Sequence, residues 1–127
     1  MDKRFSVFSS LLALVLFSLP VAAYAASFEE LSSQGYKTSK LERNKAGMFG
    51  WMLSKENSRY FCTFRLGLAY SGKNEIVSFS TSGRMFTLDR KAFEKHAAGR
   101  GGNFPQYEDL KAGRPRPDDV GSCRKLA

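Results

Sequence analysis

The sequence is poor in the residues on which most enzyme sites depend. Its 127 residues include one histidine, two cysteines and one tryptophan. A nucleophilic triad needs a histidine, and the single candidate is His96, with no G-x-S-x-G motif to present a serine. We expect His96 to lie in the last turn of a helix, where the helix dipole favours a cation. The sequence therefore predicts a protein that is not an enzyme.

The side chains that hold metals and cofactors are equally scarce. Structural zinc takes four cysteine or histidine ligands, and the chain has three such residues in all. Neither cysteine lies in the C-x-x-C motif of thiol oxidoreductases. The adjacent carboxylate pairs are Glu29–Glu30, Glu108–Asp109 and Asp118–Asp119, and neighbouring side chains do not face each other. We expect helix capping by the first pair, solvated loops for the other two, and neither a cofactor nor a metal.

Acidic side chains are scarcer than basic ones. The chain has 12 Asp and Glu against 20 Lys and Arg, which makes a formal net charge of +8. With 43% hydrophobic and 25% charged residues, it has the composition of a globular protein. Its length corresponds to one domain and excludes repeat arrays and membrane proteins with many spans.

The N-terminal segment has the pattern of a secretory signal peptide. Lys3 and Arg4 are followed by an uncharged stretch, residues 5–25, in which Pro20 interrupts the apolar run. Ala23–Ala25 then places small residues where signal peptidase cleaves. The alternative is an uncleaved anchor, because 21 uncharged residues just span a bilayer. We expect a signal peptide over 1–25.

Cleavage after Ala25 leaves a single mature domain, residues 26–127. It removes two basic side chains and one acidic one, so 18 basic and 11 acidic residues remain, with a net charge of +7. About 100 residues bury only a modest core. The short positive segment and early cleavage site favour a periplasmic or secreted bacterial protein.

Both cysteines, Cys62 and Cys123, fall in the mature domain. In an exported domain an even number of cysteines indicates a disulfide, and only one pairing is possible here. Such a bridge ties the C-terminal tail to a probable central strand. By restricting the unfolded chain, such a bridge should stabilise the folded domain by about 4 kcal/mol.

Hydrophobic periodicity predicts an α+β fold. A capping box at Ser27–Glu30 begins a helix over 28–34, and a second helix is expected over 90–98. Alternation predicts a four-stranded antiparallel β-meander over 48–88, with the three-residue hairpin loop Thr81–Gly83. The expected strands are 48–54, 59–69, 76–80 and 84–88, with an edge strand over 36–43. The domain is thus a meander of four to five strands flanked by two short helices, with one disulfide.

The C-terminal part is expected to be less regular. A single helical turn is predicted over 106–111, and residues 114–117 are expected to be extended and exposed. Three aromatic side chains outside the meander, Tyr36, Phe104 and Tyr107, are the best candidates for exposed stacking platforms beside basic residues.

The excess of basic residues is the main pointer to function. Lys37, Lys40 and Arg43 follow one another along the first strand, and Arg90, Lys91 and Lys95 gather on the second helix. If these groups meet, they form a patch that attracts an anionic envelope component or an acidic protein, and nucleic acid is not excluded. The alternative is that the charge only keeps the protein soluble.

Five short segments resemble small signal-bearing periplasmic proteins of alphaproteobacteria. They are Leu31, Gly35–Tyr36, Leu53–Lys55, Tyr60–Cys62 and a lone C-terminal cysteine, and they cover about a third of the chain. That group is uncharacterised, so the resemblance implies a compartment and a size but no active site.

The segment Thr81–Phe86 is similar to the Ser-Gly loop of periplasmic inhibitors of C-type lysozyme, which are small disulfide-bridged β proteins. The resemblance implies an inhibitor or interaction module that uses this hairpin. The net charge argues against a lysozyme inhibitor, because such lysozymes are basic and a domain of net charge +7 repels them. Both possibilities, a basic-surface binding protein and an inhibitor, follow from the sequence.

Overall fold

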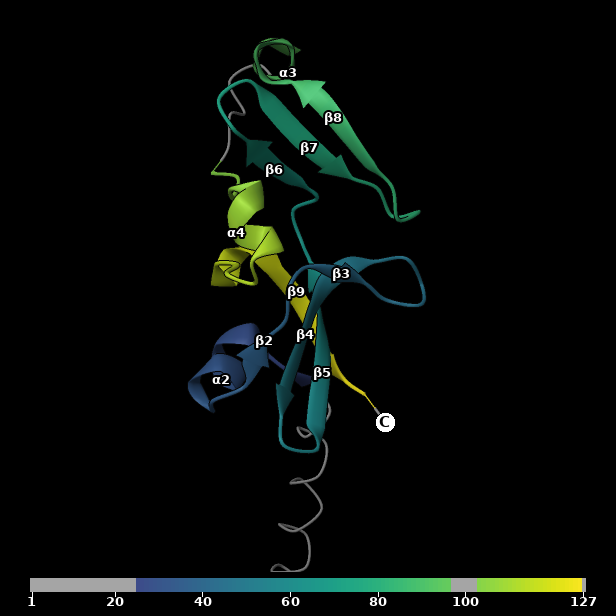
Figure 1. The fold of residues 1–127 in the computed structure, drawn as a ribbon, viewed down its shortest axis with the longest axis vertical. Coiled ribbons are helices and arrows are strands. Elements are labelled where there is room, and N and C mark those ends of the chain that lie inside the picture. Colours follow the sequence, from purple (N-terminus) through teal and green to yellow (C-terminus); the bar gives the residue numbers. More distant parts are fainter. Residues whose placement is uncertain (1–24, 97–102, 127) are drawn as a thin grey trace, which may run out of the picture.

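The computed structural model describes residues 25–96 and 103–126. Two antiparallel sheets and a few short helices make up this part of the chain, and the predicted α+β class is confirmed. Figure 1 shows the two sheets stacked end to end, with the C-terminal segment running beside the junction. The predicted signal peptide lies outside the described residues except for its last residue, Ala25.

The larger sheet has the order β1-β9-β5-β4-β2, and β3 also pairs with β4. Its core is the hairpin of two seven-residue strands, β4 and β5, whose turn places Glu56 at a φ of 55°. The predicted edge strand over 36–43 forms two short strands, which both pair with β4. The strands are β1 (Ala25–Ala26), β2 (Lys37–Thr38), β3 (Glu42–Arg43), β4 (Phe49–Lys55), β5 (Ser58–Phe64) and β9 (Val120–Lys125).

The disulfide joins two neighbouring strands of this sheet. Cys62 on β5 is directly opposite Cys123 on β9, with 4.0 Å between the Cα atoms, and the two sulfurs are bonded. The predicted pairing and the central position of the Cys62 strand are confirmed. The tail that the bridge ties down is itself a strand.

The hydrophobic core lies between one face of the larger sheet and two helices, α2 (Phe28–Ser33) and α4 (Tyr107–Lys111). Leu31, Trp51 and Leu110 are fully buried there, and the Trp51 indole N–H donates to the Leu110 carbonyl oxygen at 2.9 Å. The capping box is confirmed: the Ser27 hydroxyl accepts from the Glu30 N–H at 3.1 Å and the Glu30 carboxylate accepts from the Ser27 N–H at 3.3 Å.

The second sheet is a three-stranded meander of β6 (Leu68–Ser71), β7 (Glu75–Phe79) and β8 (Met85–Asp89). The predicted continuous strand over 59–69 is wrong, since β5 ends at Phe64 and a new strand begins at Leu68. Gly67 lies between them with a φ of +73°, in the left-handed region that interrupts an extended strand. The expected single meander is therefore divided between two sheets.

The hairpin loop and the second helix follow this meander. The loop ends at Gly83 with a φ of +84°, as predicted for the glycine position. The second helix, predicted over 90–98, is α3 (Arg90–His96) in the described part of the chain. No described residue of α3 is buried: Ala92 is exposed, Phe93 is half-buried, and Ala97 lies outside the described residues.

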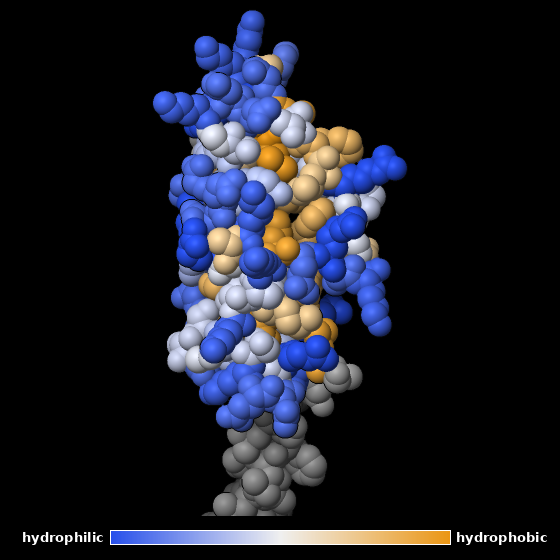
Figure 2. Space-filling model, viewed as in Figure 1, coloured by the Kyte–Doolittle hydropathy of each residue, from blue (hydrophilic) through white to orange (hydrophobic). Residues whose placement is uncertain are grey.

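The aromatic residues expected at the surface are partly buried. Tyr36 packs edge-on against Tyr60, Phe104 against Tyr70 and Tyr107 against Phe79, with ring centroids 5.6 to 5.8 Å apart. The large apolar side chains that the structure exposes are Met48, Met85, Phe86 and Leu88. Figure 2 shows apolar side chains at the surface along the upper right, where β8 lies in Figure 1.

The segment before β9 is a buried polar network instead of an exposed loop. Asp119, at the end of a 3-10 helix over Pro117–Asp119, is fully buried. Its carboxylate accepts hydrogen bonds from the Arg116 backbone N–H and guanidinium, both at 2.8 Å, and the bond from the guanidinium raises the pKa of Arg116. The guanidinium also donates to the Asn103 carbonyl oxygen at 2.6 Å. Pro115 is buried as well, so the expected exposure of 114–117 is only partly right.

Candidate anion-binding site

The six basic residues predicted to contact a partner fall into two groups on different elements, one on and between β2 and β3 and the other on α3. Lys37 and Lys40 lie in and beside β2, on the larger sheet, whereas Lys91 and Lys95 lie on α3, beyond the smaller sheet (Figure 1). All four side chains are exposed. The fold therefore does not gather the predicted residues into a single patch.

Arg43, the third residue of the first group, joins the two sheets. Its guanidinium donates from Nη1 to the Gly83 carbonyl oxygen at 2.7 Å. The same group lies over the Phe49 ring, 5.9 Å from the centroid. Part of its hydrogen-bonding capacity is thus used within the protein, and the remaining guanidinium N–H groups are those that can meet a ligand.

Arg90, in the second group, is also engaged. Its Nε donates to the Glu94 carboxylate at 2.8 Å, and its guanidinium lies 4.0 Å from the centroid of the Tyr70 ring. This pairing neutralises one of the three cations on α3. Lys91 and Lys95 are the residues of this helix that remain suited to contact an anion.

The larger sheet has a second face, opposite the core. Met52 pairs with Phe61 and Ser54 with Arg59 across the β4–β5 hairpin. Directly paired residues share a face, and alternate residues change face, so these four side chains lie opposite Trp51. Since α2 and α4 pack on the Trp51 side, this second face is the one left for a ligand.

A groove of about 640 Å³ lies on this face. Met52 and Phe61 provide an apolar floor, and the cations Lys45 and Arg59 line its sides. Arg43 also borders the groove, but it is paired with Phe49, and its guanidinium is directed to Gly83 and the Phe49 ring. The remaining lining residues are Glu42, Asn44, Ala46 and Leu126. Basic side chains around an apolar floor are suited to a ligand that carries both negative charge and apolar surface.

Gly50 allows the floor to form. A Cβ atom at Gly50 would collide with the Cys62 carbonyl oxygen and lie 2.9 Å from the ring atoms of Phe61. The Phe61 ring therefore lies against the backbone of β4 and is 6% exposed. The Phe61 side of the floor is therefore held in place by the β4 backbone, whereas Met52 is half-buried.

The charge in and beside the groove is predominantly positive. Its lining contains three cations and one carboxylate, that of Glu42. Arg124 on β9 is paired with Phe61 and exposed, so it adds a further cation to the same face. The potential here attracts anions, and added salt weakens that attraction at exposed positions.

Sequence reasoning found one groove residue, Arg43, and missed Lys45, Arg59 and Phe61 as contacts. Lys45 lies in the turn between β3 and β4, two residues after Arg43. The sequence did contain a signal for Arg59 and Phe61. They are two residues apart in a predicted strand, so they share the face opposite the predicted core.

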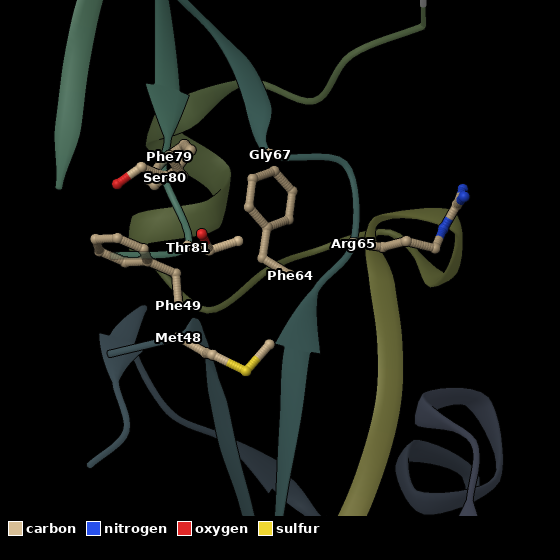
Figure 3. A pocket seen from close by; sticks show the side chains of 8 residues that line it. All are labelled: Met48, Phe49, Phe64, Arg65, Gly67, Phe79, Ser80 and Thr81. Atoms are coloured by element: carbon tan, nitrogen blue, oxygen red, sulfur yellow. The ribbon is translucent and has the colours of Figure 1, made fainter. Parts of the chain in front are cut away.

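A smaller pocket of about 130 Å³ lies where the two sheets meet (Figure 3). Phe49, Phe64 and Phe79 line it, with Met48 at one side. Arg65 points away from it and donates to the Asp118 carbonyl oxygen. The pocket is below the 300 to 1,000 Å³ usual for ligand sites and directs no cation inward, so it is a weaker candidate.

Among residues 25–96 and 103–126, no cluster of three or more potential ligands could hold a metal ion. Over the same ranges, no helix has the length and apolar character to cross a membrane. His96 is exposed at the C-terminal end of α3.

Comparison with known proteins leaves the chain without an assigned relative: no protein-family model, no curated protein and no solved structure matches it.

Proposed function

We propose that this protein is a non-enzymatic, exported binding protein that holds an anionic partner in the groove on the open face of the larger sheet. One observation carries the proposal: the exposed cations Lys45 and Arg59 line a groove whose floor is Met52 and Phe61. A binding role needs only such complementarity and no nucleophile or proton-transfer group.

The chemistry of the groove favours an anionic envelope component over an acidic protein. A lipid headgroup brings phosphate to Lys45 and Arg59 and places its first methylene groups against Met52 and Phe61. A carboxylate-rich protein surface satisfies the cations but leaves the apolar floor without a partner. We therefore take a lipid phosphate as the partner, and binding to an acidic protein alone would contradict this choice.

The proposed compartment is the periplasm or the exterior, after removal of residues 1–25. The signal-peptide pattern and the disulfide support it, because disulfides persist where the environment is oxidising. The resemblance to small signal-bearing alphaproteobacterial proteins agrees with it. Mass spectrometry of the native product is expected to find Ala26 at the N-terminus and no free thiol, and an attached leader or two free thiols would contradict it.

Vesicle flotation tests the groove. Vesicles with phosphatidylglycerol are expected to bind the oxidised protein, vesicles of phosphatidylcholine are not, and binding should weaken between 50 and about 300 mM salt. Arg59→Glu and Lys45→Glu should each lower the affinity at least tenfold. Lys37→Glu and Lys91→Glu make the same change of charge outside the groove, so these controls should lose less than twofold.

The controls decide between a site and a general effect of charge. Equal losses in all four variants would show that net charge alone attracts the membrane, and the groove proposal would fail. A loss of vesicle affinity in Lys91→Glu alone would place the binding site on α3, which would also refute the proposal.

A lysozyme inhibitor remains the second candidate, because the hairpin loop is presented in a fixed shape. Ser82 and Arg84 are exposed, whereas Gly83 between them is buried and bonded to Arg43. If the loop inhibits a C-type lysozyme, Ser82→Ala combined with Arg84→Ala should abolish that inhibition. Absence of any inhibition by the unmodified protein would end this candidate.

A further inference from the structure

The smaller sheet has an open edge. Its order is β6-β7-β8, and the outer side of β6 is occupied: the Tyr70 N–H donates to the Pro105 carbonyl oxygen at 2.8 Å, and Tyr70 forms a bridge with Gln106. In the described part of the chain, no strand pairs with the outer side of β8. An unpaired edge is a template for another extended chain.

The backbone of β8 directs hydrogen-bonding groups to this open side. At one end of β8 the Arg84 carbonyl oxygen accepts from the Ser80 N–H, and at the other end the Arg90 N–H donates to the Asn74 carbonyl oxygen. The backbone groups of residues 84 and 90 are therefore directed towards β7. Because the direction alternates along a strand, Met85 and Thr87 direct their N–H and C=O groups outward. These two N–H and two C=O groups have the spacing needed to form backbone hydrogen bonds with an added antiparallel strand.

The side chains of β8 are exposed and mostly apolar. All five residues are exposed, with Met85 at 49%, Phe86 at 50% and Leu88 at 40%. Natural edge strands are commonly protected by lysine, proline or a bulge, and Met85–Asp89 contains none of these. The apolar surface in the upper right of Figure 2 lies over this edge.

Cations lie at both ends of the edge. Arg84 precedes β8 and Lys91 follows it, and both are exposed. The carboxylate of Asp89 is used inside the protein, where it accepts from the Ala92 N–H at 2.9 Å at the start of α3. A guest strand with acidic residues at its ends thus meets complementary charge at each end.

We propose that β8 binds an extended peptide segment of another protein by strand addition, with apolar side chains at its centre and acidic residues at both ends. Charge excludes a second copy of this chain as the natural occupant. The antiparallel pairing that matches all five residues is centred on Thr87 and places the Arg84 end of each copy at the Lys91 end of the other, so that cation meets cation at both ends. Two mature chains of net charge +7 also repel each other.

A labelled peptide tests this surface. The probe alternates valine and threonine over five residues between two pairs of glutamates, and its control replaces every glutamate by lysine. Fluorescence anisotropy with the oxidised protein should show at least tenfold tighter binding of the glutamate peptide. Equal binding of the two peptides, or no binding of either, would overturn the proposal.

Hydrogen exchange locates the bound peptide. The amides of Met85 and Thr87 should become protected on binding, whereas those of Phe86 and Leu88, which already face β7, should change little. Protection confined to another surface would overturn the proposal. Arg59→Glu alters the groove on the other sheet and should leave the peptide affinity within twofold. The peptide proposal and the groove proposal can therefore fail independently of each other.

Two variants test the edge itself. Thr87→Pro removes an N–H that faces outward and should lower the peptide affinity at least tenfold, whereas Thr87→Ala keeps the N–H and the affinity. Arg84→Glu with Lys91→Glu should reverse the preference to the lysine peptide, and this variant decides the question if the proline variant does not fold. Dimerisation of the protein without peptide in sedimentation would overturn the choice of occupant.

Discussion

Arg43 on β3 and Gly83 in the β7–β8 loop are joined by a hydrogen bond of 2.7 Å from Nη1 to the carbonyl oxygen. A Cβ atom on Gly83 would lie 3.1 Å from the Gly47 carbonyl oxygen, so the loop of one sheet packs closely on the turn of the other. The contact connects the groove of the larger sheet with the hairpin that carries the open edge of the smaller one.

Arg43→Ala should lower the free energy of unfolding by about 1 kcal/mol, because a hydrogen bond from a charged donor is lost at a partly exposed site. Urea denaturation measures the change. Lys45→Ala, in the adjoining turn, should stay within about 0.5 kcal/mol. Equal effects of the two substitutions would show that the bond between the sheets contributes nothing.

Removal of the disulfide should have the largest effect on stability. Cys62→Ser combined with Cys123→Ser opens a loop with a sequence separation of 61 and should cost about 4 kcal/mol. Guanidinium unfolding of the variant and of the oxidised protein gives the difference. A loss below about 1 kcal/mol would contradict the prediction that the bridge is decisive for so small a domain.

Gly50→Ala should destabilise the larger sheet by about 2 kcal/mol, because the new methyl group meets the Cys62 carbonyl oxygen and the Phe61 ring. Ser54→Ala is the control on the same face of β4. Thermal unfolding compares the two. A Gly50→Ala protein as stable as the control would show that the Phe61 floor of the groove adjusts freely.

Asp119→Asn should cost about 2 kcal/mol, because it weakens charged hydrogen bonds from Arg116 to a fully buried carboxylate. Asp118→Asn, at the exposed neighbouring residue, should stay within about 0.5 kcal/mol. Urea denaturation at neutral pH measures both. A larger loss for Asp118→Asn would contradict the assignment of the network to Asp119.

Local signals were interpreted correctly where a few neighbouring residues determine the structure. Ser27 and Glu30 form the expected capping box, and Gly83 takes the positive φ that the hairpin loop requires. The strand predicted over 59–69 was wrong because the alternation is similar on both sides of Gly67. Residues 65–67 separate β5 from β6, and Gly67 among them has the positive φ that an extended strand does not allow.

By itself, the sequence determined the α+β class, the capped first helix and the disulfide partner, since periodicity and capping act over a few residues and two cysteines allow one pairing. The tertiary structure decided which cations share a surface, that Asp119 is buried and that β8 is an open edge. These properties depend on strand register and on contacts between residues far apart in the chain, which no short segment encodes.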